Sequence, residues 1–194
     1  MNIRFLAHKV DQSGGSSFSL DLMARLLSDR GHSVTALTTN LYQENELLDN
    51  RPYKVKSNVV TSSTPIGALP EIKRTLTRYE QSTDIYHIFN PQYLPIAGWY
   101  RKNGAVPTIG RLNSYGPFCT NPGMMNKECY KNCSIINKIA HDNRDITKKP
   151  PRLPEYMYKH FSLSKTNYLD RVFALSPSIK KIYSHNGIKN NLID

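Results

Sequence analysis

The segment IRFLAHKVDQSGGSSFSLDLMARLLSDRGHSVTALT, residues 3–38, decides the fold class of this chain. It opens with an apolar run at residues 3–7, typical of a short buried strand, and continues through a polar loop into a helix. The expected apolar stripe of this helix consists of Phe18, Leu22 and Leu26, widened by Met23 and Leu27. Gly31 marks the end of the helix, and residues 34–37 predict a second strand. The segment therefore predicts one strand–helix–strand unit.

The alternation of strands and helices continues along the chain. Further strands are expected within residues 53–60 and at 85–89, 106–112 and 172–175, and helices at 70–81, 93–101, 135–140, 154–168 and after Ser176. Residues 113–152 predict an irregular insertion that holds the short helix near 135–140. Because parallel strands need crossover helices, the pattern predicts a doubly wound, mainly parallel, Rossmann-like α/β sheet. We expect a single domain over residues 1–194.

Helix ends are marked by residues that suit them. Pro70 is expected at the first position of its helix, where the missing N–H would have no intrahelical partner. Ser176 is expected to cap the last helix, with Pro177 at the first position and Gly187 just past the end.

Composition is that of an ordinary globular protein, with 39% hydrophobic and 21% charged residues among 194. No run approaches the roughly 20 apolar residues of a membrane-spanning helix, and the N-terminus does not resemble a signal peptide. Three cysteines, an odd number, fit a reducing compartment. We therefore expect a cytoplasmic protein.

Positive charge is concentrated in the second half of the chain. Residues 1–96 hold 10 Lys and Arg against nine Asp and Glu, whereas residues 97–194 hold 16 against six. Such a surface attracts nucleic acid, anionic membranes or phosphorylated small molecules, unless the charges are merely solvated. Nucleic acid is not expected, because no aromatic–basic interleaving or DNA-binding pattern is present. Lys148, Lys149 and Arg152 are the candidates for contact with an anionic membrane surface.

Ligands of doubly wound sheets bind beyond the carboxyl ends of the strands. The loops expected there carry the candidate binding residues Gly14, Gly15, Ser16, Asn90, Asn113 and Ser176, with His87 close to the end of its strand. A glycine pair before a helix favours the approach of an anion, although many domains use glycine there only to turn the chain. The loop matches neither the dinucleotide fingerprint nor the P-loop. His87, among apolar neighbours, is either a core residue or a catalyst.

The cysteines of the insertion raise the question of a metal. Cys119, Cys129 and Cys133, followed by His141, offer four side chains of the two types, thiolate and imidazole, that zinc accepts. Their spacing is not that of a common zinc module, so reduced thiols are the favoured state and no metal is expected.

Several motifs resemble the N-terminal domain of the family-4 retaining glycosyltransferases. The opening strand, the Gly14-Gly15 pair, the helix that follows and the GHSVTALT run at 31–38 are similar to the start of that family. DIYHIFNP at 84–91 is similar to its D-V-V-H strand, VPTI at 106–109 to its V-P-V-V strand, and DRVFALS at 170–176 to its D-R-V-I-A-V-S motif. The resemblance spans nearly the whole chain.

The resemblance implies the acceptor-side half of a two-domain GT-B enzyme that transfers a sugar from a nucleotide-sugar donor to a glycan or lipid-linked acceptor. Such enzymes need no cofactor and generally no metal. By position, Gly14 and Gly15 would approach the donor diphosphate and the acceptor, His87 and Asn90 would line the acceptor cleft, and Ser176 would lie at the mouth between the domains.

Two departures from the family pattern change what is expected of this chain. Asn113 stands where many family members carry a histidine, so an imidazole beside the transferred sugar is not expected, although the amide can bind a sugar hydroxyl. The family's donor domain would follow Asp194, so a C-terminal domain or partner subunit is expected, and the chain alone should be inactive. The competing interpretation is a non-enzymatic module that binds a glycan or an anionic lipid surface.

Overall fold

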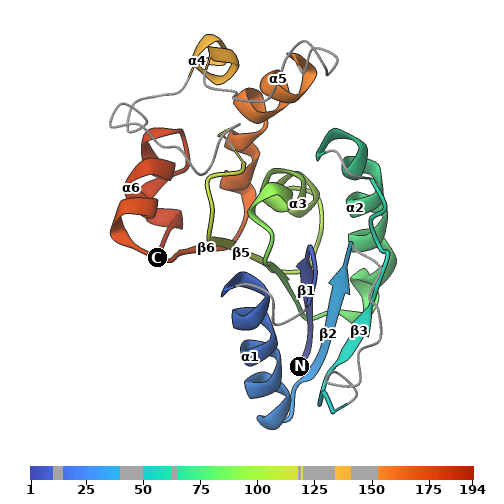
Figure 1. Ribbon diagram of the computed structural model, residues 1–194. Coiled ribbons are helices and arrows are strands. Elements are labelled where there is room, and N and C mark those ends of the chain that lie inside the picture. The colour runs from blue at the N-terminus through green and yellow to red at the C-terminus, as the bar shows by residue number, and fades with distance from the viewer. Residues whose placement is uncertain (11–14, 40–49, 63–64, 118, 120–133, 141–152) are drawn as a thin grey trace.

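The sheet of this protein has six strands, all parallel. The computed structural model describes residues 1–10, 15–39, 50–62, 65–117, 119, 134–140 and 153–194. The strands are β1 (Asn2–Ala7), β2 (Ser33–Thr38), β3 (Lys54–Lys56), β4 (Ile85–Ile88), β5 (Thr108–Leu112) and β6 (Arg171–Ala174). They lie in the order β3-β2-β1-β4-β5-β6 (Figure 1). This is the strand order of a Rossmann-type doubly wound sheet, and it confirms the predicted fold class.

Helices cover both faces of the sheet. They are α1 (Gly15–Asp29), α2 (Pro65–Tyr79), α3 (Leu94–Arg101), α4 (Ile135–Ala140), α5 (Leu153–Phe161) and α6 (Pro177–His185). The described core divides into two clusters, one in which α1 packs on β1 and β2 and a larger one built from α2, α3 and α6. None of the described helices is long and apolar enough to cross a membrane.

The α1 helix forms where predicted but is turned differently from the expected orientation. Phe18, Leu22 and Leu26, the expected core stripe, are 53%, 48% and 47% exposed. The buried positions of α1 are Ser17, Leu20, Asp21 and Ala24, while Met23 and Leu27 pack at the edge of the core. Polar side chains thus occupy places that the apolar pattern assigned to Leu and Phe.

Asp21 explains this orientation, because the fold surrounds its carboxylate with partners. The Tyr53 hydroxyl donates a hydrogen bond to it, Arg25 Nε lies 2.9 Å from one oxygen, and Arg51 Nε lies 3.2 Å from the other. Burial alone would raise the pKa of Asp21. The hydrogen bonds from Tyr53 and Arg25 and the charges of the two guanidinium groups lower it by more, so the net pKa lies below its usual value. A buried aspartate with three partners therefore faces the protein, and the leucines opposite it face outward.

Two helices differ from their expected bounds. The α2 helix begins at Pro65, so Pro70 lies inside the helix and not at its first position, as the sequence had predicted. The pyrrolidine removes one backbone hydrogen bond there, which packing of the amphipathic helix offsets. The helix expected at 154–168 is instead α5 followed by a 3₁₀ segment, Leu163–Tyr168.

The 3₁₀ segment that follows α5 packs closely against α3. A Cβ atom on Gly98 of α3 would lie 2.1 Å from the carbonyl oxygen of Lys165. The backbone of the 3₁₀ segment therefore rests directly on α3, an approach that only glycine permits.

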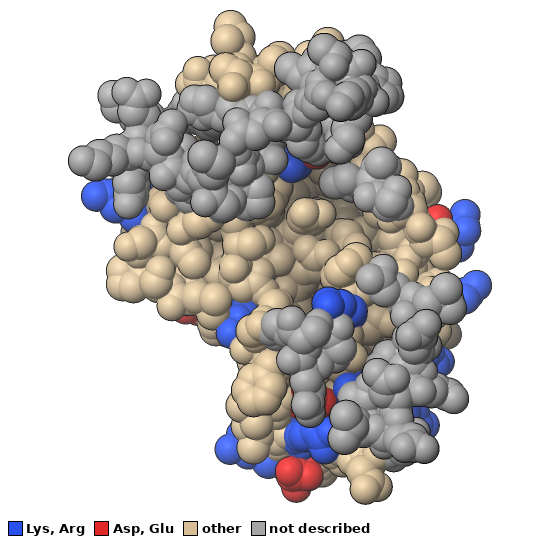
Figure 2. Space-filling model, viewed as in Figure 1, with Lys and Arg blue, Asp and Glu red and all other residues tan. Residues whose placement is uncertain are grey.

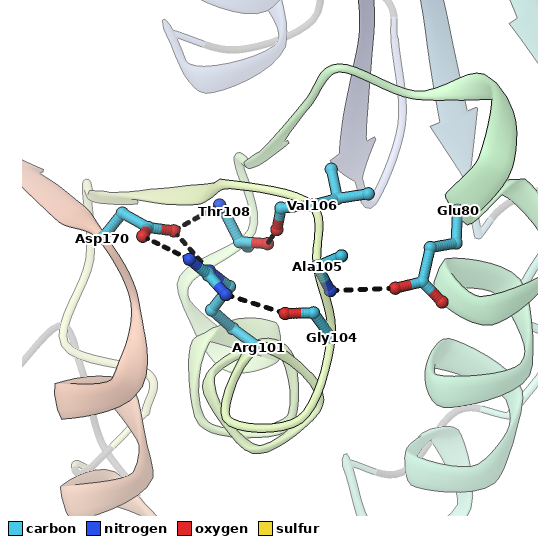
Figure 3. A network of polar contacts seen from close by, with 7 residues as sticks. All are labelled: Glu80, Arg101, Gly104, Ala105, Val106, Thr108 and Asp170. Atoms are coloured by element: carbon cyan, nitrogen blue, oxygen red, sulfur yellow. Dashed lines mark hydrogen bonds and ion pairs between the residues drawn. The ribbon is translucent and has the colours of Figure 1, made fainter.

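A polar network fastens the end of α3 to the amino-terminal ends of β5 and β6 (Figure 3). Arg101 contacts both carboxylate oxygens of Asp170, at 2.7 and 2.9 Å, and donates to the Gly104 carbonyl at 2.7 Å. The Thr108 N–H donates to Asp170 at 2.7 Å, and Glu80 accepts from the Ala105 N–H at 3.0 Å. Asp170, which belongs to one of the resemblance motifs, therefore has a structural role at the edge opposite the strand carboxyl ends.

Candidate functional site

A pocket of about 550 Å³ lies at the carboxyl ends of β1, β2, β4 and β5. It spans the point between β1 and β4 where the strand order reverses, which is the usual ligand crevice of doubly wound sheets. Its lining is Ala7, His8, Lys9, Ser16, Ser17, Thr39, Val60, Thr61, Ser62, Ala68, Phe89, Asn90, Pro91, Gln92, Tyr93, Asn113 and Ser114. In Figure 2, the middle of the molecule is hollowed where Figure 1 shows these strand ends, and the hollow is mostly uncharged.

Asn113 joins three elements of the pocket. Its Nδ2 donates to Ser16 Oγ at 2.8 Å and to the Phe89 carbonyl at 3.2 Å. It follows β5, whereas Ser16 lies in the first turn of α1 and Phe89 follows β4. The structure thus brings together two of the predicted site residues, Ser16 and Asn113, which are 97 positions apart in the sequence.

Asn90, the third predicted residue that lines the pocket, shapes the loop after β4. Its Oδ1 accepts from the Gln92 N–H at 3.1 Å and caps the 3₁₀ turn Pro91–Tyr93. This cap holds the exposed Gln92 and the buried Tyr93 at the pocket wall. Because proline starts the turn, few backbone conformations compete with it.

His87 does not line the pocket. Its ring packs between Phe5, Phe89 and Phe173, with centroid distances of 5.1, 5.5 and 6.5 Å, and the residue is 5% exposed. Burial, with a contribution from the Arg111 guanidinium, lowers the pKa of His87 to about 4. The imidazole is therefore neutral at physiological pH and lies in an aromatic cluster on one face of the sheet.

Gly15 and Ser176 also lie outside the pocket lining. Gly15 is the first residue of α1, and a Cβ placed on it would meet no atom within 4 Å. Ser176 accepts from the Ile179 N–H at 3.3 Å and caps α6, as predicted, with Pro177 beside it. Both residues belong to helix starts at the same edge of the sheet as the pocket.

Other predicted residues fall outside the described residues: Gly14, Lys148, Lys149, Arg152, Cys129, Cys133 and His141. Cys119 is described, and its carbonyl accepts from Lys159 Nζ at 3.1 Å. Among the described residues, no group of His, Cys, Asp and Glu is placed to hold a metal ion.

Several lining residues were not predicted from the sequence. His8 Nδ1 and Thr39 Oγ1 are 2.8 Å apart and join the loops after β1 and β2. Thr61 and Ser62 are held by Glu71 of α2, whose carboxylate accepts from both backbone N–H groups, at 2.6 and 3.2 Å. These hydrogen bonds, that of Thr61 first, lower the pKa of Glu71. Residues 57–62 follow an edge strand and carry no motif, so only the fold reveals their place at the site.

The lining is polar but nearly uncharged. Lys9 is the only lysine or arginine among the described lining residues, and none of these residues is an aspartate or glutamate. Hydroxyl and amide side chains both donate and accept, which matches the alternating donor and acceptor character of a polyhydroxylated ligand. Phe89, Pro91 and Tyr93 add apolar surface beside these polar groups.

The sequence matches no protein-family model and no curated protein. The fold, by contrast, is similar to solved glycosyltransferase structures. The whole chain superposes on 43% of HepE from Anabaena in complex with UDP, with a TM-score of 0.59 at 14% identity. It likewise superposes on 44% of the lipopolysaccharide outer core galactosyltransferase WaaB (TM-score 0.54, 14% identity).

A third similar structure is a glycosyltransferase from Rickettsia africae, of which the whole chain covers 41% with a TM-score of 0.53 at 14% identity. The chain thus spans less than half the length of each of these proteins. At this level of identity, the likeness concerns the fold of one of their parts.

Proposed function

We propose that this chain is the acceptor-binding half of a glycosyltransferase. It would hold a glycan or lipid-linked acceptor while a nucleotide-sugar donor is bound by a C-terminal domain or partner subunit. The observation that carries the proposal is the nearly uncharged, hydroxyl- and amide-lined pocket at the strand-order reversal. The motif resemblance to family-4 enzymes supports transfer with retention of the anomeric configuration.

The charge of the pocket favours an acceptor over a donor. A nucleotide diphosphate needs several cationic or N–H groups to replace its water, and transfer requires that the charge of the leaving diphosphate be stabilised. The described lining offers only Lys9 as a lysine or arginine. A sugar acceptor needs neutral donors and acceptors, which the side chains of Gln92, Asn113 and Ser114 provide.

The similar structures are more than twice as long as this chain, which supports a second half of the proposed enzyme. This chain covers 43% of HepE, a protein whose structure was solved with UDP. In the proposed enzyme, the remaining charge stabilisation and the closure over the acceptor come from the other half, because an open pocket keeps water around every polar contact.

Binding and transfer are tested separately. Titration of the chain with a panel of oligosaccharides, followed by amide chemical shifts, should perturb the loops after β1, β4 and β5. Gln92→Leu should weaken that binding by roughly tenfold, because a site built for hydrogen bonds loses the partner of a sugar hydroxyl. Asn191→Ala, an exposed side chain outside the pocket, serves as the matched control.

Transfer should require the second half. We expect no turnover of nucleotide sugars by the chain alone and measurable turnover when a C-terminal domain is supplied. Oligosaccharide binding without turnover in any combination would support the non-enzymatic glycan-binding module instead. Rapid transfer by the isolated chain would contradict the division of the site between two halves.

A further inference from the structure

A second concave surface, distinct from the candidate site, lies between α2, α3 and α5. It is a groove of about 370 Å³ whose walls include Leu69, Ile96, Trp99, Met157 and Phe161. Trp99, Met157 and Phe161 are 51%, 45% and 60% exposed. No aspartate or glutamate is among the described residues that line this groove. The groove is therefore apolar and free of negative charge over its described lining.

The outward faces of two helices make this surface. On α5, Leu153, Met157 and Phe161 follow one another at intervals of four residues and are all exposed. On α3, which is otherwise largely buried, Trp99 is the exposed apolar side chain. An amphipathic helix whose apolar stripe points away from the core is typical of a surface that enters the membrane interface.

Three lysines lie in the groove or beside aromatic rings at and near it. Lys73 Nζ lies 5.6 Å from the Trp99 ring, Lys102 Nζ lies 5.1 Å from the ring of the half-exposed Tyr168, and Lys165 lines the groove itself. All three lysines are exposed. Long lysine stems lie along apolar surface while their ammonium groups reach polar surroundings, and aromatic rings are enriched at the headgroup level of bilayers.

We propose that this groove docks the protein on an anionic lipid bilayer. Trp99, Met157 and Phe161 enter the boundary between headgroups and acyl chains, and Lys73, Lys102 and Lys165 contact lipid phosphates. Charge complementarity favours this occupant, because the described lining of the groove contains Lys165 and no carboxylate; Glu80 lies in the adjoining hollow that shares Ile96 and Trp99, together with Lys73. Ala68 lines the candidate site and the neighbouring Leu69 lines the groove, so α2 forms a wall of both.

The single tryptophan of the chain makes the proposal directly measurable, because Trp99 lies in the groove. Its emission should shift to shorter wavelength on addition of vesicles made of equal parts phosphatidylcholine and phosphatidylglycerol. Phospholipids brominated on the acyl chain should quench it. Pure phosphatidylcholine vesicles should bind far more weakly. An unchanged emission spectrum with the anionic vesicles would overturn the proposal.

Two sets of variants separate the contribution of the lysine charges from that of the apolar side chains. The triple variant Lys73→Gln, Lys102→Gln, Lys165→Gln should lose about fivefold in affinity per lysine at low salt, and much less at high salt. The double variant Met157→Ser, Phe161→Ser should lose roughly tenfold at both salt concentrations, since the area it buries is apolar.

The control double variant, Leu22→Ser and Leu26→Ser, changes an exposed apolar stripe that lies on α1 and should bind vesicles like the wild type. Circular dichroism verifies that each variant is folded. Equal losses in the α1 variant and the groove variants would overturn the proposal, as would a loss confined to a Lys148→Gln, Lys149→Gln, Arg152→Gln variant. A Trp99 shift that depends on protein concentration without lipid would assign the groove to a second copy of the chain.

Discussion

The two faces of the sheet are packed by different means. In the described residues of one face, α1 alone supplies the helical part of the core, and polar groups, Asp21 and His87 among them, are buried there. In the larger cluster, α2 and α3 pack together and α6 packs beside β6, and the buried side chains are mostly Leu, Ile and Tyr. The smaller cluster thus has a buried carboxylate and a buried imidazole beside its apolar residues, whereas the larger one is mostly apolar and tyrosine side chains.

The exposure of apolar side chains on a helix depends on how many other elements pack around that helix. The α3 helix lies among the sheet, α2 and the 3₁₀ segment, so almost every side of it is covered. The α1 helix covers β1 and β2 from one side, so Phe18, Leu22 and Leu26 are left facing outward. Most apolar side chains of α3 are therefore core, whereas those of α1 divide between the core, as Leu20 and Ala24, and the surface.

The largest expected effect is on the tightly packed face. Gly98→Ala should lower the free energy of unfolding by at least about 3 kcal/mol, because the added methyl group would lie 2.1 Å from the Lys165 carbonyl oxygen and overpack a rigid backbone contact. Urea denaturation measures the change. The matched substitution at the start of α1, Gly15→Ala, meets no atom within 4 Å and should change stability by less than about 0.5 kcal/mol.

On the α1 face, the expected contrast lies between two leucines of one helix. Leu20→Ala removes a side chain that is 0% exposed and should cost about 3 kcal/mol of stability. Leu22→Ala removes one that is 48% exposed and should cost less than about 1 kcal/mol. Thermal and urea unfolding of the two variants would distinguish them. A larger loss at Leu22 would show that α1 is turned as its apolar pattern predicts.

The buried imidazole should make the α1 face sensitive to pH. The pKa of His87 is lowered to about 4 in the folded protein from 6.5, so the unfolded chain binds the proton more readily between these values. Stability should therefore fall as the pH drops below 6.5, by about 2 kcal/mol at pH 5 relative to pH 8.

His87→Phe should abolish that part of the pH dependence, as measured by urea unfolding at several pH values. Asp21 and Asp170 contribute in a different window, because their lowered pKa values place their loss of stabilisation below pH 3.8. An unchanged slope between pH 5 and 6.5 in His87→Phe would contradict the burial of the imidazole.

The smallest effect on stability is expected at the start of α1, where the sequence predicts a loop that contacts an anion or acceptor. Gly15→Val places a branched side chain in open space beside the predicted anion or acceptor loop. The unfolding midpoint should scarcely move, whereas acceptor binding, or turnover when the second half is present, should fall. Unchanged activity would show that this loop does not contact the substrate.

Local patterns predicted the strands well because a buried parallel strand is a short apolar run bounded by turn residues. The runs at Asn2–Ala7, Ser33–Thr38 and Ile85–Ile88 are visible in the sequence without any partner. The cap of α6 at Ser176 was equally predictable, since its hydrogen bond is made to a residue three positions away. The start of α2 and the break after α5 were not; the 3₁₀ segment that follows the break packs on α3, a distant part of the chain.

The candidate site divides in the same way. Ser16, Asn90 and Asn113 were identified because each follows a strand or opens a helix, and the carboxyl ends of parallel strands meet at one edge. Thr61 and Gln92 were missed because nothing in their local sequence marks them, and Thr39 was missed although it follows the predicted strand at 34–37. His87 was predicted as a candidate site residue but lies in an aromatic cluster. Side chains alternate between the two faces of the sheet along β4, and that of His87 lies on the same face as Phe5 of the neighbouring strand β1.

The sequence by itself determined the class of fold, the parallel sheet and which residues stand at its carboxyl edge, because these follow from hydrophobic periodicity and turn chemistry within short segments. Only the tertiary structure decided which side of α1 is core. That choice rests on Asp21 meeting Tyr53 and Arg51, and their positions 30 or more residues away leave no trace in the helical pattern. It also decided that the exposed apolar side chains of α3 and α5 share one groove with Lys165, because helices from separate parts of the chain become neighbours only when the sheet forms.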